Sequence, residues 1–212
     1  MNVYQLDRIV RDVRIALDQN MSGDALSELG DVDTLSVDEV IRSKVAESVK
    51  RVHSQAPAYL LDGGYNFGDA VYWGDQCSGW VLLPDDFMRF VMFKMDDWSR
   101  TLFSAISSDD ADYDLQSSRF KGIRGTAQKP VCVISVRPEG RVLEFYSCKS
   151  ENALVSKAVY LPYPQIDEDD GIEICGRCYD AVVYTAAALS LATFGDSDKS
   201  NNMTELAKSV LI

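Results

Sequence analysis

The segment from Cys178 to Gly195, CYDAVVYTAAALSLATFG, carries no charge after Asp180. A helix that is apolar on nearly every side has to be buried among other elements. Gly195 suits the position just beyond such a helix, where the backbone often becomes left-handed. The segment therefore predicts a central helix near the C-terminus that other parts of the chain must cover.

Two amphipathic helices are predicted near the N-terminus. Apolar residues recur at helical spacing from about Tyr4 to Gln19, and charged residues occupy the opposite face. A polar, glycine-containing linker follows at 20–34. Ser36 and Glu39 then form a capping-box pattern ahead of a second helix, which runs from Val37 to about Gln55. We expect these helices to pack with the C-terminal helix as a bundle.

Between 71 and 163 the pattern changes to aromatic and β-branched residues. A hairpin is predicted from Pro130 to Cys148, because alternating runs flank the turn Arg-Pro-Glu-Gly. The run 79–93 predicts two strands joined by a turn at Pro84-Asp85-Asp86. Residues 107–118 are acidic and serine-rich, which predicts an exposed loop.

Two further segments complete the chain. The sequence YLPYPQIDEDDG (160–171) predicts a short extended edge strand and then an acidic turn. Beyond Asp196 we expect a polar linker and a short amphipathic segment from Leu206 to Ile212.

The order of these segments predicts the fold class. Strands and helices do not alternate, so the chain is expected to be α+β, with a helical bundle formed by N- and C-terminal helices and an inserted, mainly antiparallel β region. The expected domains are a discontinuous helical domain, 1–70 with 172–212, and an inserted β domain, 71–171.

Charge and hydropathy exclude several classes of protein. The 33 acidic and 21 basic residues give a net charge of -12, which opposes tight wrapping of nucleic acid. The N-terminal segment lacks the apolar core of a secretory signal, and no run of apolar residues is long enough for a membrane span. The odd number of cysteines, 5, then favours reduced thiols in a cytoplasmic protein.

Cys175-Gly-Arg-Cys178 is the sharpest short motif. A CxxC pair at the start of a helix is typical of dithiol redox proteins, because a helix N-terminus lowers a thiol pKa. Here the acidic residues at 167–173 oppose that effect, and the motif follows no early βαβ unit. We therefore favour two structural cysteines over a redox pair. A zinc site is not expected, because Cys77, Cys132 and Cys148 lack ligand spacing.

The remaining candidates for chemistry are weak. His53, the only histidine, is interpreted either as a helix-surface residue or as a residue that satisfies the helix dipole at the C-terminal end of its helix. The carboxylate pairs, such as Asp85-Asp86 and Asp96-Asp97, are interpreted as turn or strand-end residues, since neighbours on a strand point to opposite faces. The basic run 119–129 is interpreted as a solvated loop. We expect no catalytic activity, no metal and no cofactor.

The order of segments resembles a known family. The β region opens with LPDDFMR, which supplies Leu83, Pro84, Asp86, Phe87 and Arg89. The C-terminal helix carries an alanine-rich pattern with a tyrosine and ends on glycine and aspartate: Ala181, Tyr184, Ala186, Ala187, Ala188, Leu189, Gly195 and Asp196. With two helices ahead of them, these patterns resemble the head-to-tail adaptor proteins of short-tailed bacteriophages, also called neck or tail-tubular A-like proteins.

The resemblance implies a structural function. Such proteins form a homo-oligomeric ring, usually of twelve subunits, between the portal protein and the tail proteins. They belong to the neck of the virion, which assembles in the host cytoplasm. DNA passes through their channel only in transit, and no membrane is involved. Two alternatives remain open from the sequence: a non-catalytic bacterial interaction or scaffold module, and a CxxC thiol redox protein.

Overall fold

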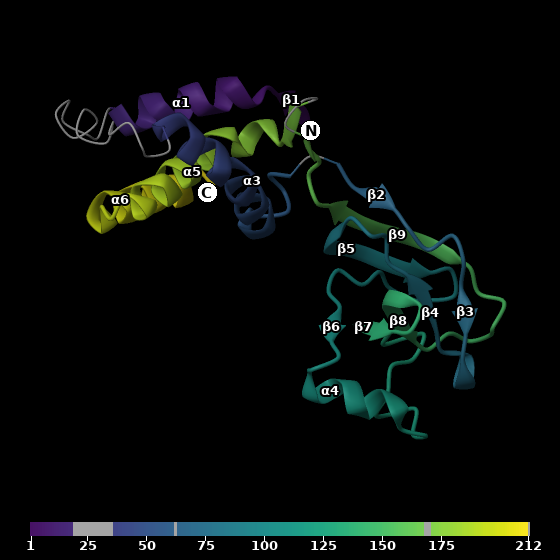
Figure 1. Ribbon diagram of the computed structural model, residues 1–212. Coiled ribbons are helices and arrows are strands. Elements are labelled where there is room, and N and C mark those ends of the chain that lie inside the picture. Colours follow the sequence, from purple (N-terminus) through teal and green to yellow (C-terminus); the bar gives the residue numbers. More distant parts are fainter. Residues whose placement is uncertain (19–35, 62, 168–170, 212) are drawn as a thin grey trace. The chain divides into compact units, whose positions relative to one another are not determined.

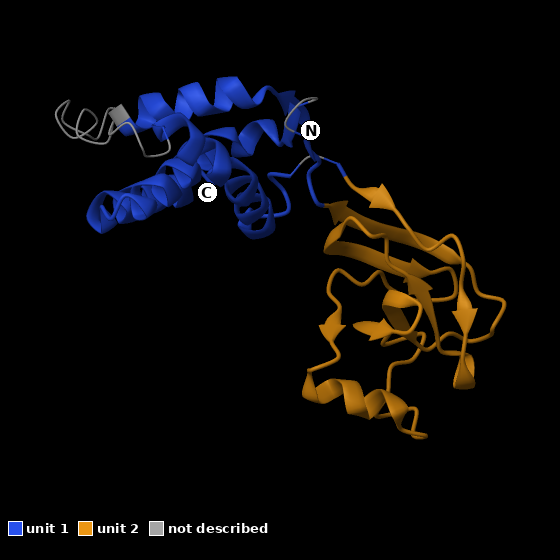
Figure 2. Ribbon diagram, viewed as in Figure 1, with its two compact units in different colours: residues 1–63, 163–212 blue, residues 64–162 orange. Residues whose placement is uncertain are grey.

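The computed structural model describes residues 1–18, 36–61, 63–167 and 171–211. These residues form a mixed α+β fold with five helices and three mainly antiparallel sheets (Figure 1). The chain divides into unit 1, residues 1–63 with 163–212, and unit 2, residues 64–162 (Figure 2). The linker expected at 20–34 and most of the acidic turn after Ile166 lie outside the described residues.

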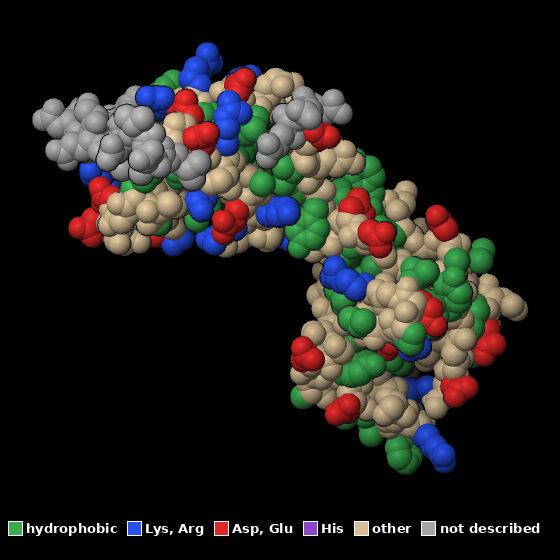
Figure 3. Space-filling view, in the orientation of Figure 1, with side chains coloured by type: hydrophobic (Ala, Val, Ile, Leu, Met, Phe, Trp, Pro, Cys, Tyr) green, Lys and Arg blue, Asp and Glu red, His purple; other side chains and the backbone are tan. Residues whose placement is uncertain are grey.

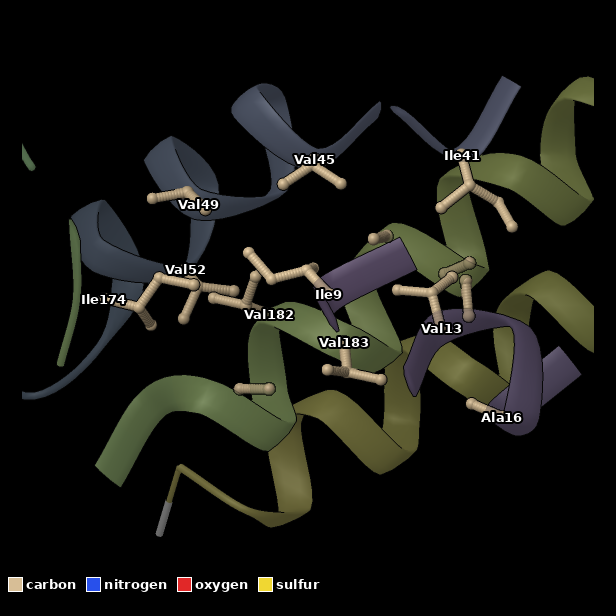
Figure 4. Packing of buried hydrophobic residues seen from close by; sticks show 14 of the residues in the cluster. Ile9, Val13, Ala16, Ile41, Val45, Val49, Val52, Ile174, Val182 and Val183 are labelled. Atoms are coloured by element: carbon tan, nitrogen blue, oxygen red, sulfur yellow. The ribbon is translucent and has the colours of Figure 1, made fainter. Parts of the chain in front are cut away.

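Four helices of unit 1 share one hydrophobic core. They are α1 (Leu6–Asp18), α3 (Val37–Gln55), α5 (Tyr179–Thr193) and α6 (Ser197–Ser209). Helix α5 contacts each of the other three, as its nearly uncharged sequence predicts. Side chains from α1, α3 and α5 interdigitate at the centre of this core, and Ile9, Val13, Ile41, Val49 and Val182 are almost completely buried (Figure 4).

Local chemistry sets the helix ends. The Ser36 hydroxyl accepts from the Glu39 backbone N–H at 3.3 Å, and the Glu39 carboxylate accepts from the Ser36 backbone N–H at 2.8 Å. This confirms the capping box at the start of α3. Gly195 has φ +84°, so it provides the left-handed residue expected after α5. The polar linker expected after Asp196 is wrong, because α6 begins at Ser197.

Asp196 explains the early start of α6. Its side chain accepts from the Lys199 backbone N–H at 3.1 Å, which is an N-cap bond. Met203 and Ala207 on α6 are buried and lie four residues apart, on the same face of the helix. This apolar face packs the otherwise polar helix against the core.

Unit 1 also contains a small sheet that the sequence analysis missed. Its order is β1-β11-β10, with β1 at Asn2–Tyr4, β11 at Gly171–Ile174 and β10 at Ile166–Asp167. Pairing of β1 with β11 joins the N-terminal segment to the segment ahead of α5. A strand of two to four residues is too short for a reliable periodic signal.

Unit 2 consists of two sheets. One has the order β2-β9-β5, with β2 at Tyr65–Asn66, β9 at Val155–Pro162 and β5 at Phe87–Met95. The other has the order β3-β4-β8-β7-β6, with β3 at Tyr72–Trp73, β4 at Gly79–Leu82, β8 at Gly140–Tyr146, β7 at Val131–Arg137 and β6 at Ile106–Ser107. All pairings are antiparallel except that of β6 with β7.

A shared aromatic core holds the two sheets of unit 2 together. Phe93 from β5 and Phe145 from β8 stack with ring centroids 5.9 Å apart. Trp98 contacts both rings edge-on. Aromatic contacts of this kind add to the stabilisation from apolar burial.

Two predictions for unit 2 need correction. The hairpin of β7 and β8 is confirmed. Two strands joined by a turn over 79–93 are confirmed as β4 and β5, which belong to different sheets. Strand β9 is not an edge strand, because it pairs with β2 on one side and β5 on the other. The segment 107–118 is not wholly a loop, since it holds part of β6, helix α4 (Ala111–Asp114) and the 3-10 turn Leu115–Ser117.

Candidate functional site

The CGRC pair lies in the core of unit 1. Cys175 and Cys178 are both fully buried, and neither forms a disulfide. The Cys175 thiol donates to the carbonyl oxygen of Leu60 at 2.8 Å. A thiol that exchanges with a substrate needs access to it. The position of these sulfurs favours their role as small core residues.

His53 is buried, so its expected position on the helix surface is wrong. Its Nε2 accepts from the backbone N–H of Cys175 at 3.1 Å, and its Nδ1 lies 2.8 Å from the carbonyl oxygen of Val49. Because Nε2 accepts, Nδ1 must carry the proton and donate. Burial lowers the His53 pKa, although the bond to Val49 raises it in part. The neutral ring thus connects α3 to the start of the CGRC segment.

The LPDDFMR segment forms the turn between β4 and β5. The Phe87 backbone N–H donates to the Pro84 carbonyl at 3.0 Å, and Leu83 is buried. The Asp86 carboxylate accepts from the Tyr160 hydroxyl at 2.8 Å, and the Phe87 and Tyr160 rings stack 5.8 Å apart. Burial, together with Asp86, raises the pKa of Tyr160 to about 12. These residues anchor the turn to β9.

The other positions that carry the resemblance lie in both units. Arg89 is half-buried on β5. Ala187 is completely buried in the core of unit 1. Tyr184 lines an open hollow of about 240 Å³ between α1 and α5, with Ile15 and Asp12 on the opposite wall. Ile15 is 50% exposed, so this hollow presents an apolar surface to solvent.

Two cysteines of unit 2 that are far apart in the sequence meet through their backbones. The backbone N–H of Cys148 donates to the carbonyl of Cys77 at 2.8 Å. Burial, with a contribution from Asp97, raises the Cys148 pKa to about 12. Burial also raises the Cys132 pKa. Within the described residues, no three side chains of His, Cys, Asp or Glu are arranged to hold a metal ion.

The most developed polar cluster in unit 2 surrounds Glu144 on β8. Its buried carboxylate accepts from the Ser135 hydroxyl at 2.9 Å, the Tyr146 hydroxyl at 2.7 Å and the Arg137 Nε at 2.9 Å. The Tyr113 hydroxyl, from α4, approaches the same carboxylate at 3.4 Å. Burial raises the Glu144 pKa, but the three close hydrogen bonds and the charge of Arg137 outweigh it, so the pKa lies below its ordinary value.

Aromatic rings continue this cluster to the surface. The Arg137 guanidinium lies 5.4 Å from the centroid of the Trp80 ring, which is a cation–π contact. The Tyr72 ring stacks on Trp80 with centroids 4.1 Å apart. Beside them is an open hollow of about 430 Å³ that Trp73, Trp80 and Tyr146 line together with polar side chains.

The segment after α4 exposes apolar side chains beside positive charges. Phe120 is 73% exposed and Ile123 is 51% exposed. The run 119–129 holds four basic residues and no acidic residue, although the whole chain has a net charge of -12. Figure 3 shows that apolar side chains reach the surface of both units. We call residues 115–123 the apolar tip, because Leu115 is exposed as well.

No family model and no curated protein matches the chain. None of the helices in the described part of the chain combines the length and apolarity that a membrane crossing requires.

Sequence reasoning missed the Glu144 cluster and the apolar tip. A glutamate in a hairpin strand ordinarily faces solvent. The sequence did indicate that Glu144 shares one face of β8 with Val142 and Tyr146, because the three residues are two positions apart. Partners such as Tyr113 lie 31 residues away in the chain, so their contact could not be read from spacing.

Proposed function

We propose that the chain is a structural protein of a bacteriophage virion, a head-to-tail adaptor that forms a ring between the portal and the tail. The resemblance of the LPDDFMR segment and the α5 sequence to such adaptors suggests this class. In the proposal, the helices from both chain ends act as a bundle that faces the portal, and unit 2 contacts neighbouring subunits.

The apolar tip carries the proposal of a ring. Phe120 and Ile123 are large, exposed and only three residues apart, and Arg119 and Lys121 lie next to them. The apolar tip is basic, whereas the rest of the chain is acidic. The tip of one subunit is therefore complementary in charge to the remaining surface of a neighbouring subunit. Contacts between unlike surfaces of identical subunits produce a closed ring when their rotation closes.

The acidic composition is compatible with a channel for DNA. A net charge of -12 repels the phosphate backbone, so DNA would pass without adhering. The acidic composition therefore supports a channel through which DNA passes and does not support a protein that binds nucleic acid tightly.

Substitution of the apolar tip tests the proposal. We expect the full chain to form a cyclic oligomer by native mass spectrometry and light scattering. The double variant Phe120→Ser, Ile123→Ser should dissociate to monomers, because the apolar area buried between subunits is lost.

Val136→Ser is the matched control, since Val136 is also in unit 2 and is 79% exposed. It should leave the oligomer intact. Retention of the oligomer by the double variant would remove the apolar tip from the interface. A wild-type chain that stays monomeric and does not bind a portal protein would refute the adaptor function itself.

A further inference from the structure

Arg124 is a buried cation that forms no ion pair with another described residue. It is 9% exposed, and its Nε atom has no hydrogen-bond partner among the described residues. None of the ion pairs between described residues includes Arg124. Burial removes the hydration of a guanidinium, and this cost is normally offset by hydrogen-bond acceptors. The position therefore favours an anionic ligand.

Arg124 lines the hollow of about 430 Å³ beside Trp80. Three other polar side chains of its wall are already engaged. Arg137 and Tyr146 donate to Glu144, at 2.9 Å and 2.7 Å. The Gln116 side chain accepts from a backbone N–H at 2.8 Å and donates to a backbone carbonyl at 2.9 Å. Of the two arginines in this wall, Arg137 is paired with a carboxylate and Arg124 is not.

The backbone next to Arg124 is fixed before any ligand arrives. The Gly125 N–H donates to the Gln116 side chain at 2.8 Å, and the Gly125 carbonyl accepts from the Ser147 hydroxyl at 3.1 Å. A Cβ atom at Gly125 would lie 2.6 Å from the Tyr146 carbonyl oxygen, so this close approach requires glycine. A fixed backbone leaves less conformational entropy to be lost when a ligand binds.

We propose that this hollow binds a carboxylate with an apolar or aromatic body. The planar guanidinium of Arg124 matches a carboxylate, which accepts two parallel hydrogen bonds. Asp75 in the wall opposes a doubly charged group such as phosphate. Trp73 and Trp80 provide aromatic surface for the body of the ligand. A free small acid and an acidic side chain of a polypeptide share this chemistry.

Tryptophan fluorescence of the full chain tests the site. Phenylacetate should produce a saturable change, benzylamine should produce none because its charge is opposite, and inorganic phosphate should bind more weakly than phenylacetate. Arg124→Met should weaken phenylacetate binding about tenfold or more, since a hydrogen bond to a charged group is lost. Arg119→Met, at an exposed arginine in the same segment, should bind as the wild type does.

Thermal unfolding provides a second readout. Phenylacetate should raise the midpoint of the wild type but not that of Arg124→Met. Without ligand, Arg124→Met should be at least as stable as the wild type, because an unpaired buried charge is removed. A large loss of stability would instead assign Arg124 a purely structural role and overturn the proposal.

The source of the carboxylate is distinguished by a second probe. Tighter binding of phenylacetate than of acetyl-Phe-Glu-amide assigns a free acid, and the reverse order assigns an acidic side chain of a polypeptide. The proposal fails if neither probe binds saturably. It also fails if Arg124→Met binds them as tightly as the wild type, or if phosphate binds more tightly than both probes.

Discussion

His53 and Glu144 are both buried ionisable residues, but the fold keeps His53 neutral and Glu144 ionised. His53 is neutral, because its Nε2 accepts from the Cys175 backbone and burial disfavours the cation. Glu144 is ionised, because three donors and Arg137 surround its carboxylate. Each should therefore give its unit a distinct dependence of stability on pH.

The pKa of His53 predicts that unit 1 loses stability in mild acid. The folded-state pKa lies below the unfolded value of 6.5, so the unfolded chain binds the extra proton first. Stability is fully present above that unfolded value and declines as the pH falls below it. We expect the free energy of unfolding to be about 1 kcal/mol lower at pH 5.5 than at pH 7.5, by urea titration with far-UV circular dichroism.

His53→Gln is the informative variant for this prediction, because the amide oxygen keeps an acceptor for the Cys175 N–H. The chain has no other histidine, so the difference between the two pH values should shrink in this variant. An unchanged difference would assign the pH dependence to other groups.

Glu144→Gln should destabilise unit 2 at neutral pH. The variant keeps the shape of the side chain but removes the charge that satisfies Arg137, Ser135 and Tyr146. We expect a loss of about 1–3 kcal/mol at pH 7, measured by urea unfolding with tryptophan fluorescence. Glu139→Gln, at the exposed hairpin turn, should have almost no effect.

The effect of Glu144→Gln has a defined pH range. Since the folded-state pKa of Glu144 is depressed, its contribution is present above the unfolded pKa and is lost as the pH falls through the folded pKa. The wild type and the variant should therefore converge in strong acid. Equal stability of the two proteins at pH 7 would contradict the structural importance of this cluster.

At the scale of the elements, a substitution at the end of α5 tests whether the left-handed backbone conformation there matters for stability. Gly195 has φ +84°, and a Cβ atom there would meet no atom within 4 Å. Gly195→Ala thus adds backbone strain without a steric clash. We expect a loss of about 1 kcal/mol in the free energy of unfolding, by circular dichroism.

Gly122→Ala is the control for that prediction. A Cβ atom at Gly122 would also meet nothing within 4 Å, and its φ is not in the left-handed region. This variant should be neutral or slightly stabilising. If both variants behaved alike, the left-handed conformation at the end of α5 would not matter for stability.

Elements with strong local signals could be predicted from the sequence. Helix α3 was predicted at Val37–Gln55 because its capping box and apolar stripe agree, and the β7–β8 hairpin because alternation and turn residues agree. Helix α6 was missed, since its polar sequence hides a stripe of only a few buried residues. The separation of β4 and β5 into two sheets depends on distant partners, which local patterns do not reveal.

The candidate site was less predictable than the fold. The turn role of Asp86 followed from its neighbours, but its bond to Tyr160 joins residues 74 positions apart. Arg124 belonged to a run that was interpreted as a solvated loop, because spacing cannot show that one arginine of the run is buried. The lack of a hydrogen-bond partner for its Nε among the described residues depends on the three-dimensional arrangement of the surrounding side chains, which the sequence does not give.

At the scale of the whole molecule, unit 2 is an insertion with adjacent ends. Tyr65 near its start pairs with Tyr160 near its end, in strands β2 and β9. The chain therefore leaves unit 1 and returns to it at neighbouring points of one sheet. Such an insertion can carry an interface without disturbing the fold of unit 1, which suits the proposed division between a portal-facing unit and a subunit-contacting unit.

Mass in solution is the most direct test of the proposed adaptor function. Native mass spectrometry of the full chain, alone and mixed with portal protein, should show one closed oligomer of discrete mass that also binds the portal. A chain that remains a monomer at every concentration and does not bind the portal would contradict the account.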